Sequence, residues 1–170
     1  MNGRTAPSHL HVAARARAAR APRVLVLGYG NPGRQDDGLG PAAAAEIEKL
    51  DWPGLTAYDN YQLVIEDAVE IAEHDVVWFV DAARKGSEPY EVLRLSPALD
   101  LAFTSHLVRP EVLLAIADQY YGKSPGAYLV GIRGYEFEFL EGLTDRASGN
   151  LEQAVAFIRH RIGRILEMPQ

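Results

Sequence analysis

Residues 23–40 read RVLVLGYGNPGRQDDGLG, and this stretch decides the fold. It opens with a short continuous run of apolar residues, 24–27, that a glycine ends, which is typical of a strand buried on both faces. A glycine-rich turn with two adjacent acids, Asp36 and Asp37, follows. Alanines and other strong helix formers then predict a helix over residues 38–50, which either acid can cap. A buried strand that leads through a turn into a helix is the beginning of a parallel β-α-β unit.

The rest of the chain continues this alternation of apolar strands and helices. Further strands are expected at 55–60, 75–83, 89–96, 126–134 and 135–142, and further helices at 63–74, 110–122 and 147–168. The segment 89–96 alternates apolar and polar residues, which favours a half-exposed edge strand. Helices between buried strands cover both faces of one sheet. We therefore predict a three-layer α/β/α sandwich around a mostly parallel twisted sheet of about five strands, with one antiparallel edge strand.

Composition limits the classes of protein and of site. The chain has 170 residues, 48% of them hydrophobic and 24% charged, which fits one globular domain. No apolar run approaches the roughly 20 residues of a membrane-spanning helix, so we expect no membrane insertion and a cytoplasmic location. The chain has no cysteine. Disulfides, thiolate metal sites and cysteine nucleophiles are thereby excluded, and any metal is held by His, Asp or Glu.

Charge is distributed unevenly along the chain. The first 23 residues hold five arginines and no acid, which leaves 12 basic against 23 acidic residues in the remainder. A folded part with this excess of acids repels a phosphate backbone, so nucleic acid is not an expected partner. The Ala/Arg-rich residues 1–22 are predicted to be a flexible extension, and residues 23–170 a single domain.

The opening turn permits three interpretations. Gly28, Gly30 and Gly33 match the dinucleotide-binding pattern G-x-G-x-x-G, but a proline removes one N–H donor and the two acids would face the diphosphate. Alternatively, the acids only favour the start of the helix and the glycines only turn the chain. In the third interpretation, one acid caps the helix while the other faces a cleft as a metal ligand or polar anchor.

Three polar residues occupy the places where parallel sheets gather their sites, at the carboxyl ends of strands. Asp37 follows the first strand, Asp81 ends the third, and His106 precedes the helix that starts near Pro110. Each has a structural reading as a cap, a turn residue or a packed loop residue. If they converge, two carboxylates and one imidazole form a site suited to Ni, Zn or Fe(II). The remaining histidines are expected to be structural: His9, His11, His74 and His160.

The strings VLVLGYGNPGRQDDGLG, FVDAA and TSH, the last followed by a proline-started leucine-rich helix, resemble the hydrogenase maturation proteases. The similarity runs from about residue 24 to 131 and into the last helix. The resemblance implies an aspartyl-type endopeptidase, a hydrolase whose Asp37, Asp81 and His106 recognise a metal and support catalysis. It also implies a supporting role for Asp36, as a helix cap.

By the same resemblance, the substrate is the large-subunit precursor of a NiFe-hydrogenase, and the nickel is supplied by that substrate as the recognition signal. Cleavage removes a short C-terminal peptide, and the loop glycines are expected to let the peptide approach the backbone. The alternative is a non-catalytic chaperone or binding module for the precursor tail. Residues 131–150 depart from the pattern common in the family and are expected to set partner choice, with Arg133 a solvated side chain rather than a substrate contact.

Overall fold

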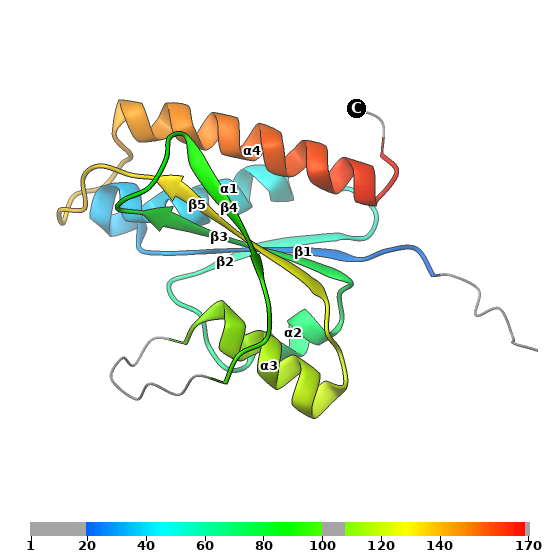
Figure 1. Ribbon diagram of the computed structural model, residues 1–170. Helices are drawn as coiled ribbons and strands as arrows, with labels where there is room; N and C mark the ends of the chain where they lie inside the picture. Colours follow the sequence, from blue (N-terminus) through cyan, green and yellow to red (C-terminus); the bar gives the residue numbers. More distant parts are fainter. Residues whose placement is uncertain (1–19, 100–107, 169–170) are drawn as a thin grey trace, which may run out of the picture.

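The computed structural model describes residues 20–99 and 108–168 (Figure 1). Its centre is a sheet of five strands in the order β2-β1-β3-β5-β4. The strands are β1 (Val24–Tyr29), β2 (Leu55–Asn60), β3 (Val76–Ala83), β4 (Tyr90–Leu95) and β5 (Gly126–Arg133). Neighbouring pairs are parallel except β4, which runs antiparallel to β5 at one edge. The predicted sheet, including its antiparallel edge strand, is confirmed.

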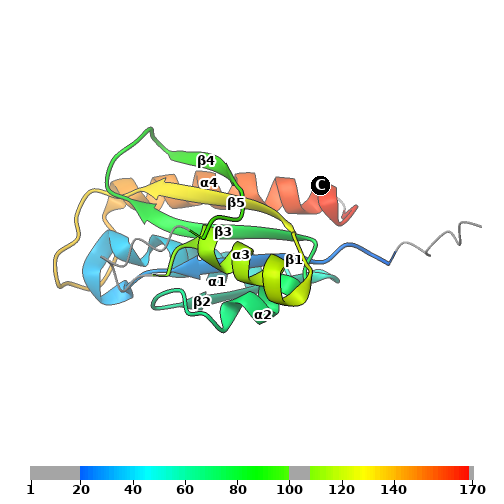
Figure 2. The same cartoon turned by 60° about the horizontal axis from the view of Figure 1, so that its bottom comes forward.

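Helices cover both faces of the sheet and complete the predicted three layers (Figures 1 and 2). One face carries α1 (Leu39–Glu48) and α4 (Asp145–Ile165), and the other carries α2 (Asp67–Ala72) and α3 (Pro110–Tyr121). Strand side chains point alternately to the two faces. On β1, Val24 and Val26 therefore pack with α1 and α4, while the two leucines between and after them pack with α2 and α3.

The strand order reverses between β1 and β3, because the chain adds β2 on one side of β1 and then returns to the other side. In parallel α/β sheets, the crevice beyond the carboxyl ends of two such strands is the usual binding site. Figure 1 shows the chain after β1, the end of β3 and the beginning of α3 at this edge of the sheet. The fold thus brings the segments after β1 and at the end of β3 to one place.

Glycines allow the beginning of α1 to pack closely on the sheet. A Cβ atom on Gly28 would lie 2.1 Å from the carbonyl oxygen of Gly40, and one on Gly40 would lie 2.3 Å from the carbonyl oxygen of Tyr29. Gly30 has φ +140°, and a Cβ atom there would lie 2.0 Å from the carbonyl oxygen of Asp37. These contacts correct the expected role of the glycines, because the space they leave is filled by this chain's own backbone rather than left for a peptide.

Three predicted elements differ in the structure, and one of them, the helix expected at 63–74, is limited to α2 (Asp67–Ala72). Residues 135–142 were expected to form a strand, but they lie in an irregular loop, residues 134–144, whose backbone bonds to the turn after β1. That turn contains a 3-10 helix, η1 (Pro32–Gly38), which the sequence pattern does not reveal. The last helix begins slightly earlier than predicted, because the Thr144 side chain accepts a hydrogen bond from the N–H of Ala147 and caps it.

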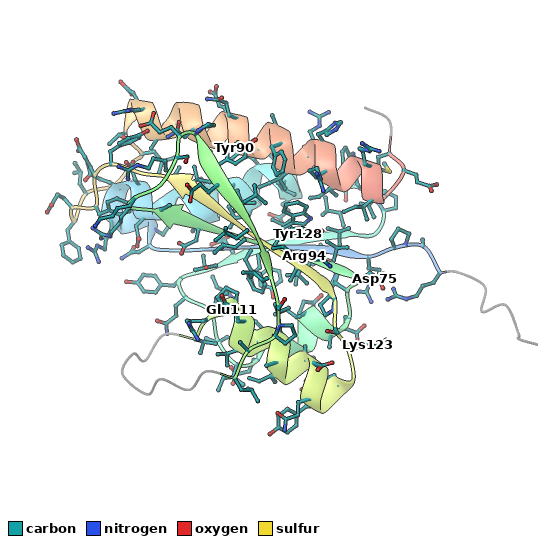
Figure 3. The ribbon with its side chains drawn as sticks, in the orientation of Figure 1. Asp75, Tyr90, Arg94, Glu111, Lys123 and Tyr128 are labelled. Carbon is teal, nitrogen blue, oxygen red and sulfur yellow. The ribbon has the colours of Figure 1, made fainter. Side chains whose placement is uncertain are left out.

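The amino-terminal edge of the sheet is held by Asp75, which Figure 3 shows at the end opposite the crevice. Asp75 accepts hydrogen bonds from the Arg20 guanidinium and from the backbone N–H of Arg23, both at 2.8 Å. Most of the predicted extension, residues 1–19, lies outside the described residues, so the extension stays a prediction. Among the helices of the described ranges, none has the length and apolar character needed to cross a membrane.

Candidate active site at the carboxyl ends of β1 and β3

Asp81, near the end of β3, is a partly buried carboxylate. Its Oδ1 accepts a hydrogen bond of 2.7 Å from the N–H of Ala82, and the Tyr29 hydroxyl, at the end of β1, donates to the same carboxylate. Burial, together with the charge of Asp37, raises the pKa of Asp81 to about 6, although the hydrogen bonds to this carboxylate act in the opposite direction and lower it. Burial, together with the Asp81 charge, also raises the pKa of the Tyr29 hydroxyl, which therefore stays a donor.

Asp37, the second acid of the pair, lies close enough to Asp81 for the two charges to interact. Its Oδ2 accepts a 3.1 Å hydrogen bond from the backbone N–H of Asn31. Asn31 is itself fixed, because its Nδ2 donates to the Tyr61 hydroxyl at 2.9 Å. The structure therefore brings two of the three predicted site residues together at the crevice.

Among the residues that the structure describes, no cation neutralises either carboxylate. Within the described residues, no Lys, Arg or His forms an ion pair with Asp37 or Asp81. Two adjacent carboxylates without a counter-ion form an oxygen donor set that suits a divalent cation, because the cation would favour the ionised form that burial disfavours. This pair therefore has the chemistry of metal ligands.

The third predicted member, His106, lies outside the described residues. In the described part of the chain, which excludes His106, no three or more His, Asp or Glu side chains form a group that could hold a metal ion. Glu111, on the first turn of α3 (Figure 3), lies close enough to Tyr29 for its charge to raise the pKa of the Tyr29 hydroxyl as well. Sequence reasoning missed Tyr29 and Glu111, although a tyrosine that ends a buried strand was a signal for the first.

Asp36 has a different role from its neighbour and does not cap α1. It is fully buried, and its carboxylate accepts hydrogen bonds from the N–H groups of Tyr135, Glu136 and Thr144 and from the Thr144 hydroxyl, at 2.7 to 3.1 Å. Burial alone would raise the pKa of Asp36, but the hydrogen bonds from Thr144, Tyr135 and Glu136 outweigh it and lower the pKa. The helix begins after Gly38 without a side-chain cap. Both predicted caps are thus wrong, because Asp36 binds the loop instead and Asp37 binds Asn31.

Gln35, the residue before Asp36 in η1, also binds the loop 134–144. Its side chain donates to the Glu136 carboxylate at 3.0 Å and accepts from the N–H of Glu138 at 3.1 Å, while its own N–H donates to the carbonyl of Leu140 at 2.7 Å. Gln35 has φ 49° and ψ −120°, a conformation that costs a non-glycine residue on the order of 1–3 kcal/mol. These contacts hold the loop 134–144 as one unit with the segment that carries Asp37.

Arg133 and His74 are both structural. The Arg133 guanidinium donates to the carbonyl oxygens of Ala83, Arg84 and Gly134, where β3 and β5 end. Arg133 is therefore half-buried and tied to the ends of these strands through one terminal nitrogen, rather than fully solvated as expected. His74 is buried, with Nδ1 2.8 Å from a backbone carbonyl oxygen of α2 and Nε2 3.1 Å from a β2 hydroxyl. The structural role predicted for His74 is confirmed.

Several solved structures with a similar fold are named as hydrogenase maturation proteases. The NiFe-hydrogenase maturation protease HycI from Thermococcus kodakarensis superposes with a TM-score of 0.67 at 22% identity, over 86% of this chain and 93% of that chain. The hydrogenase 2 maturation peptidase from Thaumarchaeota archaeon SCGC_AB-539-E09 gives 0.63 at 25% identity, over 83% and 98%. The maturating endopeptidase HybD from E. coli gives 0.57 at 25% identity, over 82% and 93%.

The chain has the fold of the hydrogenase maturation proteases. The family that its motifs predicted is confirmed by these structures, although no family model matches the sequence and none of the curated proteins does. The crevice with Asp37 and Asp81 lies within this hydrogenase maturation protease fold, and peptide hydrolysis is the chemistry that fits it.

Proposed function

We propose that this chain is an endopeptidase that removes the C-terminal peptide from the nickel-loaded large-subunit precursor of a NiFe-hydrogenase. The observation that carries the proposal is the pair of Asp37 and Asp81 at the carboxyl ends of β1 and β3, with which no cation of the described residues forms an ion pair. Its support is the fold shared with three maturation proteases over more than four fifths of this chain.

In this proposal, Asp37, Asp81 and His106 bind the nickel of the precursor, which enters with the substrate. Metal coordination can polarise a carbonyl group or lower the pKa of water, and a peptide bond needs such help to hydrolyse. Hydrolysis adds water across the amide: the C–N bond breaks, the carbonyl carbon gains the hydroxyl oxygen, and the released amine takes a proton. Because the metal arrives with the substrate, an unloaded precursor is not cut.

Residues of this chain orient the two acids for that task. The Tyr29 hydroxyl and the Ala82 N–H donate to Asp81, and the Asn31 N–H donates to Asp37. Such partners fix the direction of ligand oxygens and are worth about 10 to 100-fold in affinity or activity at metal sites. The raised pKa of Asp81 means that this carboxylate gains more from a nearby cation than an exposed one does.

Incubation with candidate precursors tests the proposal. Purified protein is mixed with nickel-loaded and nickel-free large-subunit precursors, and intact masses are followed. The proposal expects loss of a C-terminal peptide from the loaded precursor only. Full-length loaded precursor after long incubation, for every hydrogenase that the same genome encodes, would refute it.

The second candidate function is a binding module that holds the precursor tail without cutting it. Two large apolar side chains of the loop 134–144, Phe139 and Leu140, are 85% and 61% exposed. Such exposed side chains indicate a surface that binds a partner, and they fit a binding module as well as they fit a protease. A stable complex that can be isolated with uncut, nickel-loaded precursor is the outcome that distinguishes this function.

A further inference from the structure

A pocket of about 340 Å³ lies where η1, the end of β3 and the loop 134–144 meet. Two of its lining residues are cations, Arg34 and Arg84. Arg34 stands three residues before Asp37, and Arg84 stands three residues after Asp81. Each segment that carries one of the candidate catalytic acids thus also brings an arginine to this pocket. Because three extended residues span at most about 10 Å, the pocket lies beside the crevice.

Aromatic rings of the loop hold both guanidinium groups in place. Arg84 Cζ lies 4.0 Å from the centroid of the Phe137 ring, and Arg34 Cζ lies 4.9 Å from that of Phe139. An Arg34 terminal nitrogen also donates to the carbonyl oxygen of Phe137 at 3.1 Å. A guanidinium stacked on a ring keeps the N–H groups of its plane available for a carboxylate. The pocket is therefore pre-ordered for an acidic group.

Hydrogen-bond donors of the pocket remain unused. Arg34 Nε is buried and has no hydrogen-bond partner among the described residues. Arg84 forms no ion pair within the same part of the chain. The exposed guanidinium of Arg84, in contrast, can donate to a ligand that enters the pocket. Two acids also line the pocket: Glu136, which already accepts from Gln35, and Glu138, which is exposed to solvent.

Large apolar side chains stand next to these cations. Phe139 is 85% exposed and Leu140 61% exposed, at the tip of a loop that Asp36 and Gln35 fasten firmly. The residues that contribute most to binding at the centres of protein interfaces are often aromatic residues and arginines. A solvent-exposed loop that is held in one conformation, here with a strained backbone at Gln35, is typical of a binding surface rather than of a simple link between two elements.

Resting on the proposed function, we infer that this pocket binds a carboxylate of the precursor's C-terminal segment, while Phe139 and Leu140 bind apolar side chains of the same segment. Binding here places the chain that is to be cut across the crevice beside Asp37 and Asp81. Arg34 and Arg84 are positioning residues in this inference and take no part in bond cleavage. The segment recognised is therefore an extended peptide with an acidic group and at least one large apolar residue.

Peptide titrations test the inference without any cleavage. The probes are synthetic C-terminal segments of the hydrogenase precursors encoded in the same genome, each with a free and with an amidated carboxyl end. Affinity is measured for the unaltered protein and for Arg84→Gln, Arg34→Gln and Arg161→Gln. Arg161 is the matched control, since it lies 5.9 Å from the Phe157 ring on α4, away from the pocket. Loss of a charged hydrogen-bond partner is expected to weaken binding about tenfold or more in both pocket variants, with no change in the control.

The same titrations show whether the bound carboxylate is the C-terminal end of the peptide or an acidic side chain. If the chain end is bound, amidation weakens binding about as much as Arg84→Gln does; if an acidic side chain is bound, replacing that residue by its amide does so instead. Should Arg34→Gln unfold, Arg84→Gln alone decides, because Arg84 is exposed. Absence of peptide binding, or equal affinity in the unaltered protein and Arg84→Gln, overturns the inference.

Failure of the inference and failure of the proposed function give different results. If Arg84→Gln cleaves the loaded precursor with an unchanged KM, the proposed protease function is supported and the inference about the pocket is refuted. If peptide binding depends on Arg84 but no precursor is cleaved, the inference about the pocket is confirmed and the proposed protease function is refuted.

Discussion

Two adjacent acids of the opening turn perform separate tasks, which their surroundings explain. Asp36 is fully buried among four donors, whereas Asp37 is only partly buried and accepts from a single backbone N–H. A carboxylate with many internal donors stabilises the fold, since each donor would otherwise be unpaired. A carboxylate with one donor and a like charge nearby is available to bind something else. Composition and spacing do not distinguish the two residues.

Replacing each acid by its amide separates these tasks. Asp36→Asn is expected to lower the free energy of unfolding by roughly 2–4 kcal/mol, because the new NH₂ group faces backbone donors and cannot accept from them. Asp37→Asn should change it by less than about 1 kcal/mol, since its carbonyl oxygen can still accept from Asn31. Urea unfolding of both variants measures the difference. Equal losses of stability would contradict the assignment of Asp36 to the loop.

Because the pKa of Asp81 is raised, this residue is expected to make the folded chain less stable as pH rises, which is the opposite of the usual effect of an aspartate. Its pKa in the folded chain is about 6, above the ordinary value of 3.8, so the folded state holds this proton more tightly than the unfolded state. The stabilising contribution is therefore complete below about pH 4 and is lost as pH rises to about 6. Asp81→Asn keeps the acceptor oxygen and removes the charge. We expect this variant to be about 1–3 kcal/mol more stable at pH 8 and no more stable at pH 4.

Thermal unfolding of the unaltered protein and Asp81→Asn across pH 4 to 8 measures this effect. Curves that stay parallel over the whole range would show that the pKa of Asp81 is not raised by burial. We expect Asp81→Asn to be more stable but to lose cleavage of the precursor, because a buried carboxylate of an active site contributes to activity and not to stability.

At the scale of elements, the close contact of α1 with β1 depends on glycines. A methyl group on Gly28 would lie 2.1 Å from a backbone oxygen of α1 and 2.9 Å from the Cβ atom of Ala44. Gly28→Ala must therefore push α1 off the strand, and a loss of about 2–4 kcal/mol is expected. Gly149→Ala, within α4, is the control, because a Cβ atom there meets nothing within 4 Å and should be neutral or stabilising. Similar melting temperatures for the two variants would contradict this packing.

The loop 134–144 shows where sequence reasoning reaches its limit. Alternating residues at 135–142 suggested a strand, since period two is the local signal of strands. In the structure, Asp36 and Gln35 take the backbone groups that a neighbouring strand would need. A hydrogen bond between residues about a hundred positions apart leaves no periodic signal in either segment. The buried strands, in contrast, were predictable because their apolar runs report burial directly.

At the scale of the whole molecule, topology brings the site together. Asp37 and Asp81 come from different β-α units and meet because the strand order reverses between β1 and β3. The sequence could predict this meeting once the alternation of strands and helices was recognised. Their orientation by Tyr29, Ala82 and Asn31 could not be predicted, since it depends on the packed register of the strands.

His106 remains a prediction of the sequence, and activity can test it. We expect His106→Ala to reduce cleavage of the nickel-loaded precursor by roughly 100-fold or more, the size of effect that loss of a metal-binding group has. The free energy of unfolding should change by less than about 1 kcal/mol. His160→Ala, on the exposed side of α4, is the matched control. Undiminished cleavage in His106→Ala would remove this residue from the site.

The most direct measurement is the rate at which the nickel-loaded precursor loses its C-terminal peptide, followed by intact mass with enzyme in excess. It compares the unaltered protein with Asp37→Asn and with Asp59→Asn, an exposed acid on β2 at the same edge of the sheet. We predict rapid loss of the peptide with the unaltered protein and with Asp59→Asn, and a rate at least about 100-fold lower with folded Asp37→Asn. Cleavage by Asp37→Asn at the unaltered rate, or no cleavage by any of the three, would contradict the account.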